Sequence, residues 1–237
     1  MADLEQLWPG GPVLRQAAHA RLGTDCVLLA DFVRADAARR GIELGCASGA
    51  AMLLLLARTE KLHMTGIELV EEAAALAREN MAENGFAERS AVVCGDLRRC
   101  RDRFPAGSFD LVIANPPYYP RGSGALPADP ARAGARAELS CSLDDICAAA
   151  AWLLHTGGAV CLVHKPERLS ELLVSLTAHG LEPKRLRLVC RRADSAPSLV
   201  LVEARRGGRP GLRIEPPLAL CGEDGGESEE LRRICRR

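Results

Sequence analysis

The 237-residue chain lacks an obvious linker and a long apolar run. Without a Ser/Gly-rich stretch to divide it, we expect one domain, large enough to bury a single sizeable core. The longest apolar run, at residues 51–57, is far too short to cross a bilayer, and the first residues show no basic-then-apolar signal pattern. These absences predict a cytoplasmic protein with no membrane contact.

The chain also lacks net charge, which excludes a globally basic nucleic-acid binder. The charge is nevertheless uneven along the sequence. Residues 184–213 carry nine Lys and Arg against two acids, and residues 215–230 carry six acids and no base. Two interpretations stay open: a solvated face followed by a solvated tail, or a surface that faces a polyanion.

Cysteine is plentiful, but its spacing lacks the pattern of a metal site. None of the ten cysteines forms a Cys-x-x-Cys pair, and Cys94, Cys161 and Cys190 fall inside apolar, strand-like runs. A free cysteine in such a run behaves as a small hydrophobic residue. We therefore expect reduced thiols, no disulfide framework and no bound metal.

Aromatic residues are scarce, and both tyrosines directly follow one predicted strand. The apolar run at residues 109–114 ends at Asn115-Pro116-Pro117-Tyr118. Because proline has no backbone donor, the strand must stop there in a stiff turn. Open α/β sheets hold their ligands at the carboxyl ends of strands, so this tetrad is the leading candidate for the active site.

The tetrad suits methyl transfer to a planar, weakly nucleophilic amino group. The Asn115 side-chain oxygen and the Pro116 carbonyl can each accept one N–H, which orients the nitrogen and stabilises its developing positive charge. Each bond would contribute about 1.5–3 kcal/mol in the transition state. Tyr118 would stack on the substrate, worth about 1–3 kcal/mol for a base. The alternative is that the prolines merely end a strand.

Two further motifs predict a nucleoside-containing cofactor. The glycine turn from Gly45 to Gly49 joins a predicted strand to a helix, and its Gly-x-x-x-Gly spacing differs from the dinucleotide fingerprint. Glu43 could pair with the ammonium group of S-adenosylmethionine. Glu68 ends the next strand, about 20 residues further on, where an acid can accept from both ribose hydroxyls. Asp96 could accept from the adenine amino group, although a solvated turn Asp is equally compatible with its position.

The order of elements predicts an α/β, Rossmann-like methyltransferase fold. We expect a seven-stranded, mostly parallel sheet with one antiparallel strand and helices on both faces. Residues 1–23 are expected to form a flap, 24–206 the catalytic domain and 207–237 an irregular acidic tail. Among the helices, one runs from residue 24 until Gly41, and another opens at Ser142 with a capping-box pattern and closes at Gly157-Gly158.

In this order, the glycine turn, strand-end acid and Asn-Pro-Pro-Tyr resemble class I S-adenosylmethionine-dependent methyltransferases that act on exocyclic or amide nitrogens. The closer resemblance is to bacterial enzymes that methylate the adenine amino group next to the anticodon of valine tRNA. It is carried by residues 21–32, 66–85, 109–118, 136–138, 166–169 and 182–185.

Motifs and resemblance together imply a set of site residues. The catalytic residues would be Asn115, Pro116 and Tyr118. The cofactor would be held by Asp25, Glu43, Gly45, Cys46, Gly49, Glu68, Leu69, Asp96, Leu97 and Asn115. RNA, most simply tRNA, would be held by Pro117, Tyr118, Arg136, Lys184 and Arg185. Ala47 departs from the family, which usually has a middle glycine there, and the tail lacks the aromatic residues expected of it.

Other functions share the tetrad. A ribosomal RNA base or the side-chain amide of a protein glutamine could accept the methyl group, although glutamine methyltransferases usually carry an additional N-terminal helical domain. A nucleoside-binding module that has lost catalysis would be expected to show damage at Asn115, which is intact. The sequence leaves the oligomeric state open, with a monomer favoured.

Overall fold

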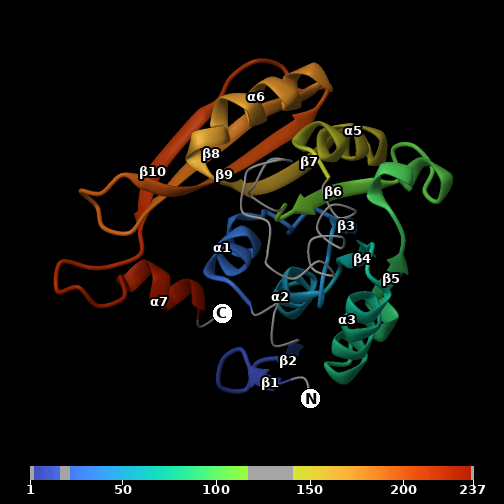
Figure 1. The fold of residues 1–237 in the computed structure, drawn as a ribbon, viewed down its shortest axis with the longest axis horizontal. Helices are drawn as coiled ribbons and strands as arrows, with labels where there is room; N and C mark the ends of the chain where they lie inside the picture. Colours follow the sequence, from blue (N-terminus) through green and yellow to red (C-terminus); the bar gives the residue numbers. More distant parts are fainter. Residues whose placement is uncertain (1–2, 17–21, 117–140, 236–237) are drawn as a thin grey trace, which may run out of the picture.

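The computed structural model describes residues 3–16, 22–116 and 141–235. Its centre is an eight-stranded sheet in the order β10-β8-β9-β7-β6-β3-β4-β5 (Figure 1). Only β9 runs antiparallel to its neighbours. The strands are β3 (Arg40–Leu44), β4 (His63–Glu68), β5 (Ser90–Cys94), β6 (Phe109–Ala114), β7 (Leu154–His164), β8 (Leu181–Cys190), β9 (Pro197–Arg206) and β10 (Arg213–Ala219).

Helices cover both faces of this sheet, as the alternation of apolar runs predicts. One face packs against α1 (Thr24–Phe32), α2 (Ala50–Arg58), α3 (Glu71–Glu83) and α7 (Glu229–Cys235). The other packs against α5 (Leu143–Leu153), α6 (Leu169–Ala178) and the 3-10 segment η2 (Leu97–Asp102). Two shorter 3-10 turns are η1 (Ala87–Arg89) and η3 (Pro166–Arg168). The predicted fold class is confirmed, with one strand more than expected.

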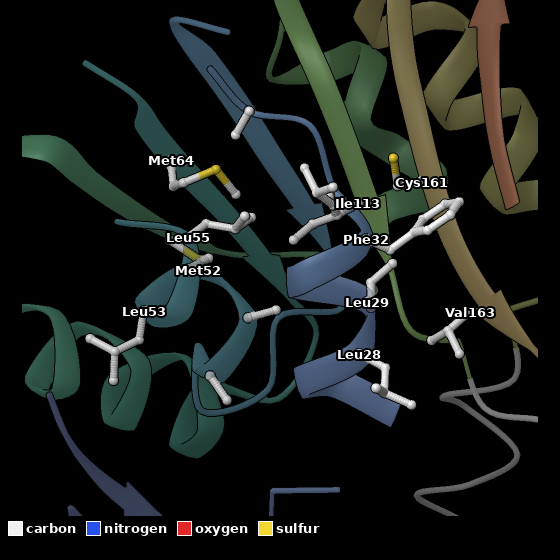
Figure 2. Packing of buried hydrophobic residues seen from close by; sticks show 14 of the residues in the cluster. Leu28, Leu29, Phe32, Met52, Leu53, Leu55, Met64, Ile113, Cys161 and Val163 are labelled. Atoms are coloured by element: carbon white, nitrogen blue, oxygen red, sulfur yellow. The ribbon is translucent and has the colours of Figure 1, made fainter. Parts of the chain in front are cut away.

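Side chains alternate between two cores because successive residues of a strand point to opposite faces. In β6, Ile113 belongs to the core under α1 and α2, whereas Val112 belongs to the core under α5 and α6. Figure 2 shows the first of these cores, where Phe32 and Leu29 of α1 lie beside Ile113. Both cores hold the central strands rigid up to their carboxyl ends.

Among the expected helix ends, one is confirmed and two are wrong. Ser142 caps α5 in a reciprocal capping box with Asp145. However, α1 ends at Phe32, far short of Gly41. Gly41 lies inside β3, where a Cβ would sit 2.4 Å from the Met64 sulfur, so close strand packing explains this glycine. Gly157 and Gly158 likewise belong to β7 and do not close a helix.

The C-terminal region is ordered, contrary to the expected irregular tail. Strand β10 pairs in parallel with β8 and forms one edge of the sheet. Its register shifts between Glu215 and Leu218, where Pro216 and Pro217 have no backbone donors. Leu231 and Ile234 of α7 are buried in the core under α1. The six acids at residues 215–230 led us to expect irregular chain, but this region contains part of β10 and the start of α7.

The N-terminal segment forms a hairpin of β1 (Asp3–Gln6) and β2 (Val13–Gln16), where a flap was expected. Asn80 of α3 and Asn84, which caps the C-terminus of α3, hold it. The Asn84 amide accepts from Val13 N and donates to Val13 O, and the Asn80 amide does the same with Arg15. Among the described residues, no helix is both long and apolar enough to traverse a bilayer.

Candidate functional site

The carboxyl ends of β6, β3 and β4 bring the predicted motifs into one row. Leu44 of β3 pairs in register with Ala114 of β6 on one side and Ile67 of β4 on the other. The following residues, Asn115, Gly45 and Glu68, therefore share one edge of the sheet. Neighbouring strands lie about 4.8 Å apart, so about 10 Å separates the outer two strands of this row.

The glycine turn leaves β3 through left-handed backbone. Gly45 has φ +74° with nothing within 4 Å of where a Cβ would lie, which leaves room beside the backbone. Gly49 has φ +79°, and its α-carbon faces Ala77 of α3, where a Cβ would be 3.2 Å from the Ala77 Cβ. The first glycine thus opens space at the edge, while the second serves helix packing. Between them, Cys46 is buried.

Glu68 is held in place by the backbone around it. One carboxylate oxygen accepts from Ala47 N at 2.8 Å, and the other accepts from Val70 N at 3.0 Å. The residue is 7% exposed. Each carboxylate oxygen has a second lone pair, so the group can accept further hydrogen bonds without changing its orientation. Leu69, the next residue, exposes 38% of its surface at the same strand tip.

Glu43 is a carboxyl group buried beside the start of α2. It is 4% exposed, and one of its oxygens accepts from Met52 N at 3.2 Å. Burial raises the pKa of Glu43 to about 8, and the nearby Glu68 charge acts in the same direction. A carboxyl in this state attracts a cation, because a positive partner would offset the cost of its ionisation.

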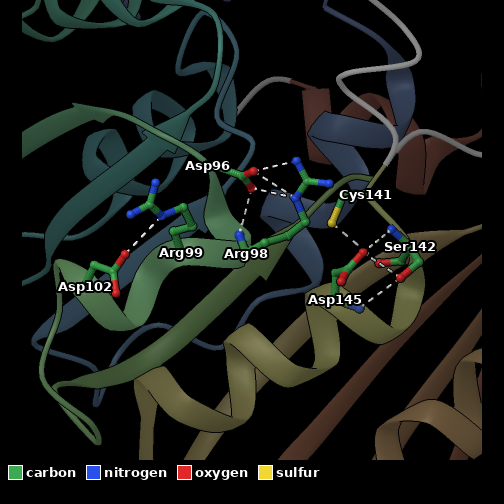
Figure 3. Close-up of polar contacts among 7 residues, drawn as sticks. All are labelled: Asp96, Arg98, Arg99, Asp102, Cys141, Ser142 and Asp145. Carbon is green, nitrogen blue, oxygen red and sulfur yellow. Dashed lines mark hydrogen bonds and ion pairs between the residues drawn. The ribbon is translucent and has the colours of Figure 1, made fainter.

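Asp96 and Leu97 continue the row beyond β5. Asp96 caps η2, accepting from Arg98 N, and both of its oxygens accept from the Arg98 guanidinium (Figure 3). These hydrogen bonds lower the pKa of Asp96. Leu97 packs at the margin of the core under α5. Asp96 therefore has a local structural role, and its contact with adenine stays a prediction.

The remaining predicted ligands fall into two groups. Asp25 lies in the first turn of α1, where it accepts from Cys26 N at 2.8 Å, while Gly23 takes the N-cap position. Asn115 is half-buried and Pro116 is buried directly after β6. Pro117, Tyr118 and Arg136 lie outside the described residues, so their predicted roles stay predictions.

Arg185 is not available to bind RNA, and this corrects the sequence interpretation. It is 7% exposed, its guanidinium pairs with Glu203 at 2.9 Å and Glu215 at 3.5 Å, and it lies 3.7 Å from the Phe32 ring centroid. Lys184 donates to the carbonyl of Arg209 at 2.9 Å. Arg185 thus keeps a buried carboxylate paired, and Lys184 donates to the backbone of the same C-terminal part of the fold.

Asn80 is the residue that the sequence analysis missed. Its side chain is fully buried, and besides holding Arg15 it donates to the carbonyl of Ser48 at 2.9 Å. It therefore joins the N-terminal hairpin to the glycine turn. Its signal in the sequence is an amide at helical spacing from Ala77, on the apolar stripe of α3.

Comparisons with known proteins agree with this geometry. A family model described as "Methyltransferase domain" matches residues 42–121, which hold the glycine turn, Glu68 and the tetrad. The tRNA1(Val) (adenine(37)-N6)-methyltransferase of Tolumonas auensis is 32% identical over 212 residues, 89% of this chain and 86% of that protein. The chain belongs to this methyltransferase family. The relative from Serratia proteamaculans, also 32% identical, covers 95% of this chain and 88% of its own length.

Solved structures support the fold of this tRNA methyltransferase family member. A predicted O-methyltransferase of Agrobacterium tumefaciens superposes with a TM-score of 0.73 at 25% identity, covering 90% of this chain and 96% of that one. A geranyl diphosphate methyltransferase, solved in complex with SAM, superposes with a TM-score of 0.58 at 15% identity over 76% of this chain and 84% of its own. The fold alone is compatible with more than one acceptor atom, so the acceptor must come from the site.

Proposed function

We propose that this protein transfers a methyl group from S-adenosylmethionine to the exocyclic amino group of an adenine in tRNA. The observation that carries this proposal is the in-register row of strand ends, which brings Asn115 within two strand spacings of Glu68. Family membership supports an adenine at position 37 of valine tRNA as the target. We expect such an enzyme to work in the cytoplasm.

The residues of the row fit the cofactor. The open space at Gly45 admits a ligand against the backbone, and the fixed oxygens of Glu68 suit a ribose diol. The exposed Leu69 offers an apolar contact for a purine, and Glu43 supplies a buried counter-charge for an ammonium group. Cys46, Gly49, Asp96, Leu97 and Asp25 complete the proposed cofactor site. S-adenosylmethionine would supply an electrophilic methyl group.

On the substrate side, the chain provides acceptors and no general base is required before attack. The Asn115 side-chain oxygen and the Pro116 carbonyl accept the two N–H groups of the adenine amine, so its lone pair is oriented for attack. These bonds strengthen as the nitrogen becomes positive, which lowers the barrier. Tyr118 stacks on the base. The target base must leave the anticodon-loop stack to reach this edge.

Two substitutions test the division of labour. Asn115→Ala should lower the methylation rate at least about a hundredfold, the effect of losing one transition-state bond of about 3 kcal/mol, with cofactor affinity within a few-fold. Glu68→Ala should act mainly on cofactor affinity, measured by calorimetry. An Asn115→Ala variant with full activity would refute the acceptor role.

The substrate itself is tested separately. Nucleoside mass spectrometry of tRNA from cells with and without the gene should show loss of N6-methyladenosine. If the methylated product appears instead in ribosomal RNA or on a protein glutamine, the tRNA assignment is wrong, while the shared amine chemistry still stands.

A further inference from the structure

The basic run at residues 184–213 is neutralised only in part within the fold. Arg185 is buried against Glu203 and Glu215, and Arg187 contacts Glu230 at 2.9 Å. The acid-rich segment that follows the basic run thus neutralises part of it. Arg206, also in this run, makes no ion pair with a carboxylate in the described part of the chain.

Three arginines that make no ion pair with a carboxylate in the described part of the chain are Arg101, Arg103 and Arg206. Arg103 places its guanidinium against Gly95, just past the tip of β5. Arg101 lies over the ring of Trp152, with its guanidinium carbon 5.1 Å from the ring. Arg206, at the end of β9, donates only to the carbonyl of His179.

Arg101 and Arg206 border the same cavity of about 750 Å³. Its walls come from the ends of α5 and α6 and the start of β7, and they include Arg101, Gly107, Trp152, His155, His179 and Arg206. The two histidines hydrogen-bond to Asp110 and Asp144, at 3.0 and 2.8 Å. Neither carboxylate pairs with an arginine of the cavity, so the guanidinium groups of Arg101 and Arg206 keep donors that are free of an ion pair in the described part of the chain.

The cavity lies at the amino edge of the parallel strands, opposite Asn115 and Glu68. Helix α5 has 11 residues, so it spans about 16 Å between the two edges. Segment η2 packs along it: Arg98 lies near the start of α5 (Figure 3), and Arg101 reaches Trp152 near its end. A ligand in the cavity is thus too far away to be the target base, but it can be another part of the same long molecule.

We propose that this cavity binds a nucleotide of the RNA substrate at a distance from the methylated base. The proposal rests on the proposed function and adds a second contact for the same RNA. Arginine matches phosphate with a planar fork of donors, and a base can stack on the indole or on the guanidinium plane. Arg103, whose guanidinium lies against Gly95 just past the tip of β5, would meet phosphates nearer the strand-tip row.

The decisive experiment compares two double variants that each remove two positive charges. Arg101→Gln/Arg206→Gln removes the unpaired charges of the cavity. Arg99→Gln/Arg192→Gln is the matched control, because these exposed arginines already pair with Asp102 and Asp194. Thermal melting establishes that both variants fold. Binding of full-length tRNA is then measured across a range of salt concentrations, together with cofactor affinity and methylation.

The cavity variant should bind tRNA at least about tenfold more weakly, since each charge-assisted contact is worth about that factor. The slope of log affinity against log salt should lose about 1.4–1.8 in magnitude, for two phosphates fewer. Cofactor affinity and the methylation rate at saturating tRNA should stay within about twofold. The control variant should keep the tRNA affinity and salt slope of the wild type.

Two results would overturn the inference. In the first, the cavity variant binds tRNA as tightly as the control variant while the wild type methylates tRNA, which leaves the proposed function standing. In the second, AMP binds saturably to the cavity while tRNA affinity is unaffected by the substitutions, which makes it a site for a free nucleotide. Wild-type protein that binds tRNA through these arginines but never methylates it would refute the proposed function alone.

Discussion

At the scale of single residues, Ala47 has a strained backbone conformation. It is the only residue other than glycine with positive φ in the described chain, at +45°. Its backbone N–H donates to Glu68, so the glycine turn retains this conformation despite its cost. The left-handed region costs an L-residue about 1–2 kcal/mol.

Replacing this residue should stabilise the protein. In Ala47→Gly, relief of the left-handed backbone outweighs the extra entropy of an unfolded glycine, about 0.5–1 kcal/mol. The free energy of unfolding should rise by up to about 1 kcal/mol in urea titrations. Ala50→Gly, in the first turn of α2, is the control and should lower it by a similar amount. A destabilised Ala47→Gly variant would contradict this account.

Glu43 makes the stability of the free protein depend on pH. Burial raises the pKa of Glu43 from its ordinary value of 4.5 to about 8, so the folded protein holds a proton on this carboxyl between these pH values. Stability is therefore greatest below about pH 4.5 for this group and falls as pH rises towards 8, by up to about 1.4 kcal/mol per pH unit.

The substitution Glu43→Gln should remove this slope. When unfolding is measured from pH 5 to pH 9, the variant should become more stable than the wild type as pH rises. Its cofactor affinity should be lower than that of the wild type. Glu72→Gln, at an exposed position of α3, is the control and should follow the wild type. Parallel curves for the wild type and the Glu43 variant would show that the carboxyl is not strained by burial.

At the scale of elements, the contact between the N-terminal hairpin and α3 is linked through Asn80 to the glycine turn. Asn80 and Asn84 hold the hairpin with the same pair of hydrogen bonds, but of the two only Asn80 is seen to donate to Ser48. Asn80→Ala should weaken S-adenosylmethionine binding about tenfold, the value of one buried hydrogen bond of about 1.4 kcal/mol.

Asn84→Ala is the matched control for this prediction. It loosens the hairpin equally but leaves the Ser48 bond intact, so calorimetry should find cofactor affinity within about twofold of the wild type. Equal losses in the two variants would mean that the hairpin as a whole supports the turn, and that Asn80 has no separate role.

Element types were predictable where local chemistry decides them. The capping box at Ser142 and the acid-rich start of α3 are local signals, and both helices form as expected. The end of α1 was not predictable, because Gly41 has the spacing of a helix terminator but is required by Met64 on the neighbouring strand. The local sequence around a residue does not show which distant strand it will contact.

At the scale of the whole molecule, the buried pair of Arg185 and Glu203 ties β8 to β9. Arg185→Ala leaves the buried Glu203 carboxylate with only the partly exposed Arg205 at 2.9 Å, so the free energy of unfolding should fall, by up to about 3–5 kcal/mol. Arg192→Ala removes an exposed pair with Asp194 and should change it by less than about 1 kcal/mol. Chemical denaturation measures both; a loss below 1 kcal/mol for Arg185→Ala would show that Arg205 alone compensates the Glu203 charge.

The candidate site was predictable as far as the ends of strands can be recognised from the sequence. Glu68, Gly45 and Asn115 each end an apolar run, and register then brings them together. The pairing of Arg185 with Glu215 could not be inferred, because it depends on β10, whose prolines suggest irregular chain. Charge counts along a sequence do not show which charges meet in three dimensions.

The two prolines of β10 have a consequence for how the molecule behaves in a crowded cell. An outer strand with free backbone groups invites a second copy to add on, and repeated addition leads to fibrils. Pro216 and Pro217 have no backbone N–H to donate, and the register of this strand shifts at these residues. The C-terminal margin is thereby protected from aggregation, even though the Ile214 side chain is 66% exposed beside it.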